Sequence, residues 1–283
     1  MNSFQEKFSQ HYSQVFTVDA VLHRARTRFQ DVLVFENRLF GRVLVLDGVV
    51  QLTEGDNHIY HEMIAHVPLM AHGSARRVLI IGGGDGGTLK EALKYPVEEA
   101  VLVEIDGEVI ELSKRFFPAV SGGAFEDSRA AIMLGDGVKY VDETEARFDV
   151  IIVDSTDPIG LGEQLFTAGF YDRCKRLLMP GGIIAVQSGA SFYPPEQLEA
   201  VCNRLTLSFD AVESFLAPVP TYAGGMLALI AAGDSHDALR PPEETLRERF
   251  QRLDLQTHYY TPEVHRAAFV LPPMFAGSSI REP

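Results

Sequence analysis

The sequence has few cysteines and no long apolar run. Its two cysteines, Cys174 and Cys202, are too few for a disulfide framework or a four-cysteine metal site, and they favour a reducing compartment. The longest strongly apolar stretch, residues 226–232, is far shorter than the roughly 20 residues that span a bilayer. The N-terminus has no apolar segment of the kind found in signal peptides. We therefore expect a cytoplasmic protein that does not bind membranes.

Basic residues are also scarce, since 25 Lys and Arg stand against 39 Asp and Glu, for a net charge of -14. Such a charge repels nucleic-acid phosphates and favours cationic partners, although many enzymes are acidic only for solubility. Hydrophobic residues make up 46% of the 283 residues, enough for one large domain or two unequal ones. This composition excludes a disordered chain, a collagen and a disulfide-stapled miniprotein.

Two hydrophobic patterns divide the chain. Up to residue 58, alternating or β-branched residues predict strands over 15–21, 30–35 and 42–46, with a tight turn at Asp47-Gly48. A helical pattern begins at Ile59 and is expected to end near Pro68. Beyond residue 77, the predicted strands cover 78–81, 100–105, 132–134, 150–153, 183–187 and 226–232. Two predicted helices end near Tyr95 and Phe117, and two more cover 170–179 and 243–253.

This alternation of strands and helices predicts an α/β fold. We expect a Rossmann-like, doubly wound parallel sheet of the class I methyltransferase type over residues 59–283. A small β-domain over residues 1–58 is expected to precede it.

A glycine-rich loop, Gly82-Gly-Gly-Asp-Gly-Gly87, lies between a predicted strand and a predicted helix. It contains the pattern G-x-G-x-x-G. Glu104 follows 22 residues after Gly82, at the end of the next strand, where a carboxylate can bind two ribose hydroxyls. The loop therefore predicts a nucleotide site. The alternative is a tight turn that needs glycine only for close packing.

Asp85 bears on which nucleotide would bind. Loops that hold a pyrophosphate use backbone N–H groups and the positive end of a helix, so a carboxylate among them would repel it. A nucleoside joined to a cation, such as an S-adenosyl sulfonium compound, would instead be attracted. Asp85 thus argues against an NAD-dependent oxidoreductase. The alternative interpretation of Asp85 is that it is only an exposed helix N-cap.

Three more aspartates follow predicted strands: Asp136 after the third strand of this region, and Asp154 and Asp157 after the fourth. Ligands of open α/β sheets bind outside the C-terminal ends of the strands, where Asp85 and Glu104 are also expected. Any one of these residues could be an ordinary turn residue. Together, five carboxylates at one edge predict a crevice for a polycationic substrate.

Other patterns of catalytic sites are missing from the sequence. His61 and His66 are five residues apart, whereas a zinc-protease helix needs four, so no metal site is expected. There is no G-x-S-x-G elbow and no phosphate-binding lysine after the glycine loop. We expect Cys174 and Cys202 to lie in helices as small apolar residues.

Further short motifs accompany the glycine loop in a fixed order. They are Phe29-Gln-Asp31, Leu46-Asp-Gly48, Tyr60-His-Glu-Met63, Glu104-Ile-Asp106, Gly135-Asp-Gly137, Asp154-Ser-Thr-Asp-Pro158, Val219-Pro-Thr-Tyr222, Tyr259-Tyr260 and His265-Arg-Ala-Ala-Phe269. From about residue 20 to 275, this ordered set resembles the polyamine aminopropyltransferases, and the spermidine synthases among them.

The resemblance implies transfer of an aminopropyl group from decarboxylated S-adenosylmethionine to putrescine, giving spermidine and methylthioadenosine. The donor is a co-substrate, so no cofactor is expected, and a homodimer or homotetramer is implied. The residues implied to bind the donor are Gln30, Asp85, Glu104, Asp136, Gly137 and Leu161. Those implied to bind the amine are Tyr60, His61, Asp85, Asp154, Ser155, Thr156, Asp157, Gln187 and Tyr222, with Asp154 as the catalytic proton acceptor.

The chain departs from its relatives at three places. Leu161 stands where they usually have proline, Asn57-His58 where Glu-Phe is common, and Ser188-Gly-Ala190 where several have a glutamate. The acceptor therefore stays open between putrescine, cadaverine, diaminopropane, agmatine and spermidine. Residues 159–165, which include two glycines, form a candidate mobile lid.

Two functions of other kinds remain as alternatives. A small-molecule methyltransferase would share the fold and use intact S-adenosylmethionine, but Asp85 and the pair Asp154 and Asp157 argue against it. A non-catalytic polyamine-binding homologue would have lost the proton acceptor or the donor loop, and both are present.

Asp85 generates a prediction about donor choice. Intact S-adenosylmethionine carries a carboxylate on the arm that Asp85 would face, whereas the decarboxylated form presents only an ammonium. We expect the decarboxylated donor to bind about tenfold or more tightly than the intact one, and Asp85→Asn to weaken it. Calorimetric titration with both compounds measures this preference. Equal affinity of the wild type for both, with no loss in the variant, would contradict the assignment.

Overall fold

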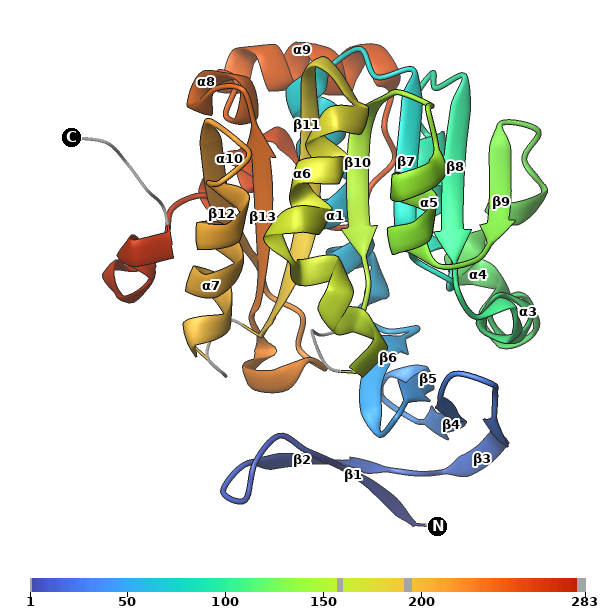
Figure 1. Cartoon of the computed structure of the whole chain (residues 1–283). Coiled ribbons are helices and arrows are strands. Elements are labelled where there is room, and N and C mark those ends of the chain that lie inside the picture. Colours follow the sequence, from blue (N-terminus) through green and yellow to red (C-terminus); the bar gives the residue numbers. More distant parts are fainter. Residues whose placement is uncertain (1, 157–159, 191–194, 279–283) are drawn as a thin grey trace.

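In the computed structural model of the protein (Figure 1), the described residues form three β-sheets. The structure describes residues 2–156, 160–190 and 195–278. The two small sheets come from the N-terminal residues and lie beneath a large sheet that has helices on both faces. This arrangement confirms the expected α/β fold with a small N-terminal β-domain.

The N-terminal part contains a two-stranded and a four-stranded antiparallel sheet. Their strands are β1 (Ser3–Lys7), β2 (Ser13–Thr17), β3 (Ala20–Arg26), β4 (Asp31–Asn37), β5 (Gly41–Leu46) and β6 (Val49–Thr53). The turn between β5 and β6 has positive φ at both Asp47 (48°) and Gly48 (83°), as the predicted tight hairpin requires.

The single strand predicted over residues 15–21 is wrong, because the chain changes partners within it. Phe16 pairs with β1, whereas Ala20 and Val21 pair with β4 of the other sheet. The apolar pattern runs through the change without a break, and hydrogen bonding alone divides the segment.

The large sheet has the order β12-β13-β11-β10-β7-β8-β9 among the described residues. Its strands are β7 (Arg77–Gly82), β8 (Glu99–Glu104), β9 (Ala130–Leu134), β10 (Phe148–Asp154), β11 (Leu178–Ala190), β12 (Ala211–Ala217) and β13 (Leu227–Gly233). The strands from β11 to β9 are parallel, but β13 is antiparallel to both β11 and β12. The sheet is therefore mixed rather than wholly parallel.

Helices cover both faces of this sheet. They are α1 (Asn57–His72), α2 (Gly87–Leu93), α3 (Gly107–Phe116), α4 (Pro118–Ser121), α5 (Gly137–Glu143), α6 (Ala168–Leu177), α7 (Pro195–Leu205), α8 (His236–Leu239), α9 (Glu243–Leu253) and α10 (Pro262–Ala268). Short 3-10 helices are η1 (Ala124–Glu126), η2 (Gly160–Phe166), η3 (Ala223–Gly225) and η4 (Pro273–Ser278).

Strand alternation divides the core between the two faces. Val78 and Ile80 of β7 belong to the core that includes buried residues of α1 and α2, and Leu79 and Ile81 belong to the core on the other face, which includes residues of α5, α6 and α7. Figure 1 shows α5, α6 and α7 in front of the sheet and α1 behind it. Both cysteines are buried in helices of the front layer, as expected.

Several element boundaries differ from those predicted. α1 continues through Pro68 to His72 and ends at Gly73, whose φ is 79°. Almost every residue of α1 from Tyr60 onward is buried, so packing outweighs the missing N–H of the proline. The helix expected up to residue 179 ends at Leu177, where β11 begins. The patterns do not predict β1, β12, α4, α5, α7, α8 or α10.

The topology of the large sheet fixes where a ligand can bind. From β7 the chain proceeds outward to β8 and β9, and β10 then returns to the other side of β7. Crevices at such reversals, outside the carboxyl ends of the strands, are the usual ligand sites of open sheets. Here Gly82 pairs with Asp154 at the reversal, and these strand ends point toward the N-terminal sheets (Figure 1).

Gly82 provides a prediction about folding. Its φ is 85°, and a Cβ there would lie 2.1 Å from the carbonyl oxygen of Asp154. Gly181 has a similar φ of 78°, but a Cβ there would have no neighbouring atom within 4 Å. We expect Gly82→Ala to lower the free energy of unfolding by about 3 kcal/mol and Gly181→Ala by about 1 kcal/mol. Urea denaturation of both variants measures this, and equal losses would contradict the steric account.

Candidate active site

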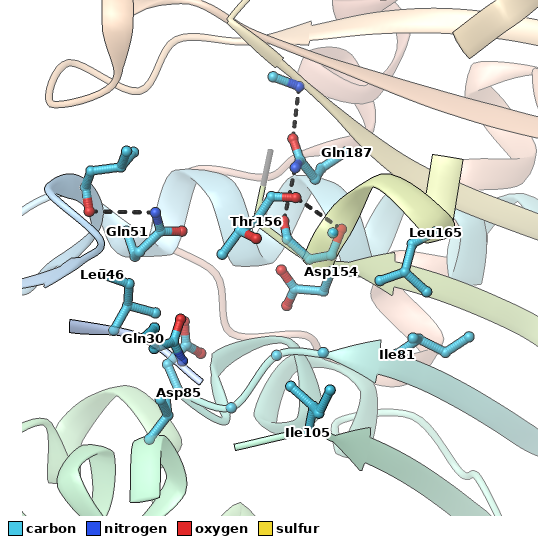
Figure 2. Close-up of a pocket in the computed structure, with 18 of the residues that line it drawn as sticks. Gln30, Leu46, Gln51, Ile81, Asp85, Ile105, Asp154, Thr156, Leu165 and Gln187 are labelled. Carbon is cyan, nitrogen blue, oxygen red and sulfur yellow. Dashed lines mark hydrogen bonds between the residues drawn. The ribbon is translucent and has the colours of Figure 1, made fainter. Parts of the chain in front are cut away.

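A cavity of about 520 Å³ opens at the reversal between β7 and β10. The glycine loop, the ends of β8 and β10 and residues of the N-terminal sheets form its walls. The predicted site residues that line it are Gln30, Tyr60, Asp85, Glu104, Asp136, Gly137, Asp154, Ser155, Thr156, Gln187 and Tyr222. Figure 2 shows the carboxylate of Asp154 pointing into the open space between these walls.

Three predicted residues are not seen on the wall. His61 is only 2% exposed, and its Nε2 lies 3.2 Å from Asp85 Oδ2, so its part in binding the amine stays a prediction. Asp157 lies outside the described residues. Leu161 belongs to η2, but its side chain falls outside the described part of the chain. Gln164 and Leu165 of η2 do line the cavity, and the mobility of this segment stays a prediction.

Asp154 ends β10 and is held by hydroxyl groups from two helices. Tyr60 Oη donates to its Oδ1 (2.5 Å), and Thr88 Oγ1 donates to its Oδ2 (2.6 Å). Burial raises the pKa of Asp154, as does the nearby charge of Asp85, although His61 and the two hydroxyl bonds oppose the shift. Asp154 is therefore a stronger proton acceptor than an ordinary aspartate.

Tyr60 stays protonated in this setting. Burial raises the pKa of its phenol well above the usual range, and the negative charge of Asp154 raises it further. The hydroxyl is consequently a hydrogen-bond donor to the carboxylate at every physiological pH.

Asp85 forms a buried ion pair at the tip of the glycine loop. Its Oδ2 lies 3.2 Å from His61 Nε2, and its Oδ1 accepts the backbone N–H of Gly87 (2.7 Å). Burial works to raise the pKa of Asp85, but the charge and hydrogen bond of His61 outweigh it, so the pKa is lowered. The interpretation as an exposed N-cap is wrong, because Gly86 caps α2 and the Asp85 side chain is 16% exposed.

Glu104 ends β8, and apolar residues lie beside it in the cavity. Its Oε1 accepts the backbone N–H of Asp106 (2.8 Å). Burial raises the pKa of Glu104 to about 7, and the charge of Asp106 adds to the shift. A Cβ on Gly84 would come within 2.8 Å of Oε2, so glycine leaves room for the carboxylate. Ile81 and Ile105 supply apolar surface nearby.

Hydrogen bonds within the protein position two further predicted residues of the cavity wall. Gln30 Nε2 donates to Asp106 Oδ2 (2.9 Å), which ties the N-terminal sheet to the start of α3. Asp136 caps α5 by accepting the N–H of Val138 (2.8 Å), and it is exposed at the rim. Acidic and amide groups thus converge from four strand ends, as the sequence predicts.

The wall around Gln187 and Tyr222 is polar but already hydrogen-bonded. Gln187 Nε2 donates to the carbonyl of Ser155 (2.8 Å), and its Oε1 accepts the N–H of Gly189 (2.7 Å). Tyr222 Oη donates to the carbonyl of Gln51 (2.7 Å). These bonds fix the shape of this wall before any ligand arrives.

Sequence reasoning missed some residues of the site. Thr88 is a common residue in a helix, and nothing in the sequence indicates that its hydroxyl reaches Asp154. Glu6, Lys7 and Phe8 line the cavity from the N-terminal hairpin, more than 140 residues away along the chain from Asp154. The one available signal is Glu6, an acidic residue in an otherwise alternating strand, which is buried and accepts the N–H of Val50 (3.0 Å).

Metal sites and membrane spans have no candidate in the part of the chain that the structure describes. No three His, Cys, Asp or Glu side chains among these residues are grouped so that they could hold a metal ion. No helix within the same residues is both long and apolar enough to cross a membrane.

Comparison with protein families gives two matches that together span most of the chain. Residues 4–54 match the spermidine synthase tetramerisation domain, and residues 57–239 match the spermine/spermidine synthase domain.

Individual relatives are similar over nearly their whole length. The polyamine aminopropyltransferase 1 of Pseudomonas aeruginosa is 49% identical over 96% of both chains. The polyamine aminopropyltransferase of Escherichia coli O1:K1 / APEC is 45% identical over 99% of this chain and 98% of its own. A crystal structure of spermidine synthase in complex with the transition state analogue AdoDATO superposes with a TM-score of 0.92, at 35% identity over 98% of this chain and 94% of that one. For spermidine synthase from Thermotoga maritima the TM-score is 0.89, at 34% identity over 98% and 93%.

The buried Glu104 generates a prediction about pH and stability. Its pKa is about 7 in the folded protein against an ordinary value of 4.5, so the folded state holds a proton that the unfolded chain has lost. We expect stability to fall by up to about 3 kcal/mol as the pH rises from 4.5 to 7. Glu104→Gln removes this loss. Urea denaturation of both proteins from pH 5 to 8 tests it, and parallel stability curves would contradict the burial effect.

Proposed function

The chain belongs to the spermine/spermidine synthase family of aminopropyltransferases, and from that premise we propose that it transfers an aminopropyl group from decarboxylated S-adenosylmethionine to putrescine. The products are spermidine and methylthioadenosine. The observation that carries the proposal is the buried Asp154 carboxylate, which faces the same cavity as Asp85 and Glu104.

The nucleoside of the donor fits the part of the cavity that Glu104 occupies. An ionised Glu104 accepts hydrogen bonds from the two ribose hydroxyls, and Ile81 and Ile105 flank the base. The other proposed donor contacts are Gln30, Asp136, Gly137 and Leu161. Asp85, which His61 keeps ionised, receives the ammonium of the aminopropyl arm.

Asp154 deals with the charge of the acceptor amine. An alkylamine with a pKa of roughly 10.4 is protonated at pH 7, and freeing its lone pair costs about 4 to 5 kcal/mol. Asp154 takes the proton from the ammonium, so that the nitrogen attacks the carbon next to the sulfonium. The new C–N bond forms as the C–S bond breaks, and the electron pair of the C–S bond goes to sulfur. The leaving thioether is neutral and needs no acid, and one proton is released per turnover.

The remaining polar wall would hold the acceptor. Tyr60, Ser155, Thr156, Gln187 and Tyr222 line the cavity together with Asp154, and Asp157 follows in the sequence. Their rigid hydrogen bonds support selection of a diamine by length. The reaction as written needs neither a metal nor a cofactor.

We also propose a homo-oligomer, a tetramer or a dimer, that works in the cytoplasm. The match of residues 4–54 to a tetramerisation domain supports the assembly. Two free, buried cysteines are consistent with a reducing compartment.

The proposed function predicts which products form and that their formation requires Asp154. Purified protein incubated with decarboxylated S-adenosylmethionine and putrescine is expected to form spermidine and methylthioadenosine, detected by mass spectrometry. Asp154→Asn should lower kcat by a factor of about 100 to 10,000, because the proton acceptor is lost. The matched control is Asp234→Asn, whose carboxylate pairs with Lys175 on the surface and should leave the rate unchanged.

The same assay separates the alternatives. Product formed only with cadaverine, diaminopropane, agmatine or spermidine would keep the mechanism and change the acceptor. Methyl transfer from intact S-adenosylmethionine, with no product from any amine, would overturn the proposal.

A further inference from the structure

Thr88 lies outside the cavity but bonds to the proposed proton acceptor. Its side chain is fully buried in the first turn of α2, and its hydroxyl donates to Asp154 Oδ2 over 2.6 Å. We propose that Thr88 is a positioning residue, which orients the Asp154 carboxylate and keeps it ready to take the proton of the amine. This inference rests on the proposed function.

The two hydroxyl groups around Asp154 clamp its carboxylate from two different helices. Tyr60 of α1 occupies one oxygen and Thr88 of α2 occupies the other. Each carboxylate oxygen has two lone-pair directions, so one remains on each oxygen after these bonds form. The clamp thus fixes the plane of the carboxylate and leaves acceptor capacity for the substrate.

Thr88 differs from Tyr60 in its access to the ligand. Tyr60 lines the cavity and can touch the substrate, whereas Thr88 is 0% exposed and absent from the wall. Asp154 lies between Thr88 and the ligand. Gly83 leaves room for the Asp154 carboxylate, because a Cβ on Gly83 would lie 2.9 Å from Asp154 Oδ2. Removal of the Thr88 hydroxyl can therefore affect the reaction only through Asp154.

The charges around Asp154 make this bond important. Burial disfavours the ionised form of Asp154, and the charge of Asp85 does so as well. Hydrogen bonds from neutral hydroxyls favour ionisation without adding a cation that would repel the amine. The titratable groups that face Asp154 are Asp85 of the glycine loop, Tyr60 and His61 of α1, and Glu104 of β8.

The experiment compares Thr88→Val, which has nearly the same shape, with Thr88→Ser, which restores a hydroxyl. We expect Thr88→Val to lower kcat about tenfold and to move the acidic limb of the kcat profile upward by about one pH unit, with the KM for the donor changed less than about twofold. Thr88→Ser should recover most of both effects. Ser214→Ala removes a buried hydroxyl that contacts Cys202 on the far edge of the sheet, and it should change neither.

A second measurement needs no substrate. The Asp154 carboxyl is titrated by carbon NMR in protein labelled at aspartate, with Asp154→Asn used for assignment, and its pKa should rise by about one unit in Thr88→Val. A folded Thr88→Val with the wild-type titration would overturn the inference, as would an unchanged pH profile. A wild type without aminopropyltransferase activity would overturn the proposed function, while the titration would still decide whether Thr88 controls Asp154.

Discussion

The contact between Gly82 and Asp154, where β7 pairs with β10, is the constraint on which the rest of the site depends. The parallel register brings the end of β10 against the start of the glycine loop, so that Gly83 N donates to the Asp154 carbonyl over 2.8 Å. Any side chain at Gly82 would collide with that carbonyl. Because the two strand ends are locked together, the glycine loop and Asp154 keep a fixed distance. In-line displacement requires such a fixed geometry.

Around this contact, carboxylates of similar chemistry have different proton affinities. The pKa of Asp85 is lowered by a buried histidine, whereas burial raises the pKa of Glu104 and that of Asp154. One group is thereby suited to hold a permanent cation and another to receive a proton. His61 lowers the pKa of Asp85, whereas burial and the charge of Asp85 raise the pKa of Asp154 against the opposing hydrogen bonds of Thr88 and Tyr60.

Much of the site could be predicted because strand ends in a parallel sheet converge. Glu104, Asp136 and Asp154 each follow a short apolar run, and that placement alone brings them to one edge. β12 is not predicted, because the polar residues Glu213 and Ser214 interrupt its apolar pattern, although both are buried. The position of His61 also could not be predicted, since α1 is buried on nearly every side and its pattern does not say which face meets the glycine loop.

Local periodicity and chain order are enough to establish the alternation of strands and helices, the glycine loop and the carboxylates at the strand ends. Which other groups share the cavity with these carboxylates depends on how the elements pack. This packing brings Glu6 from the N-terminal hairpin to the channel and the hydroxyls of Tyr60 and Thr88 to Asp154. Proton affinity depends on burial and on charges and hydrogen bonds within a few ångströms, and those neighbours come together only when separate elements pack.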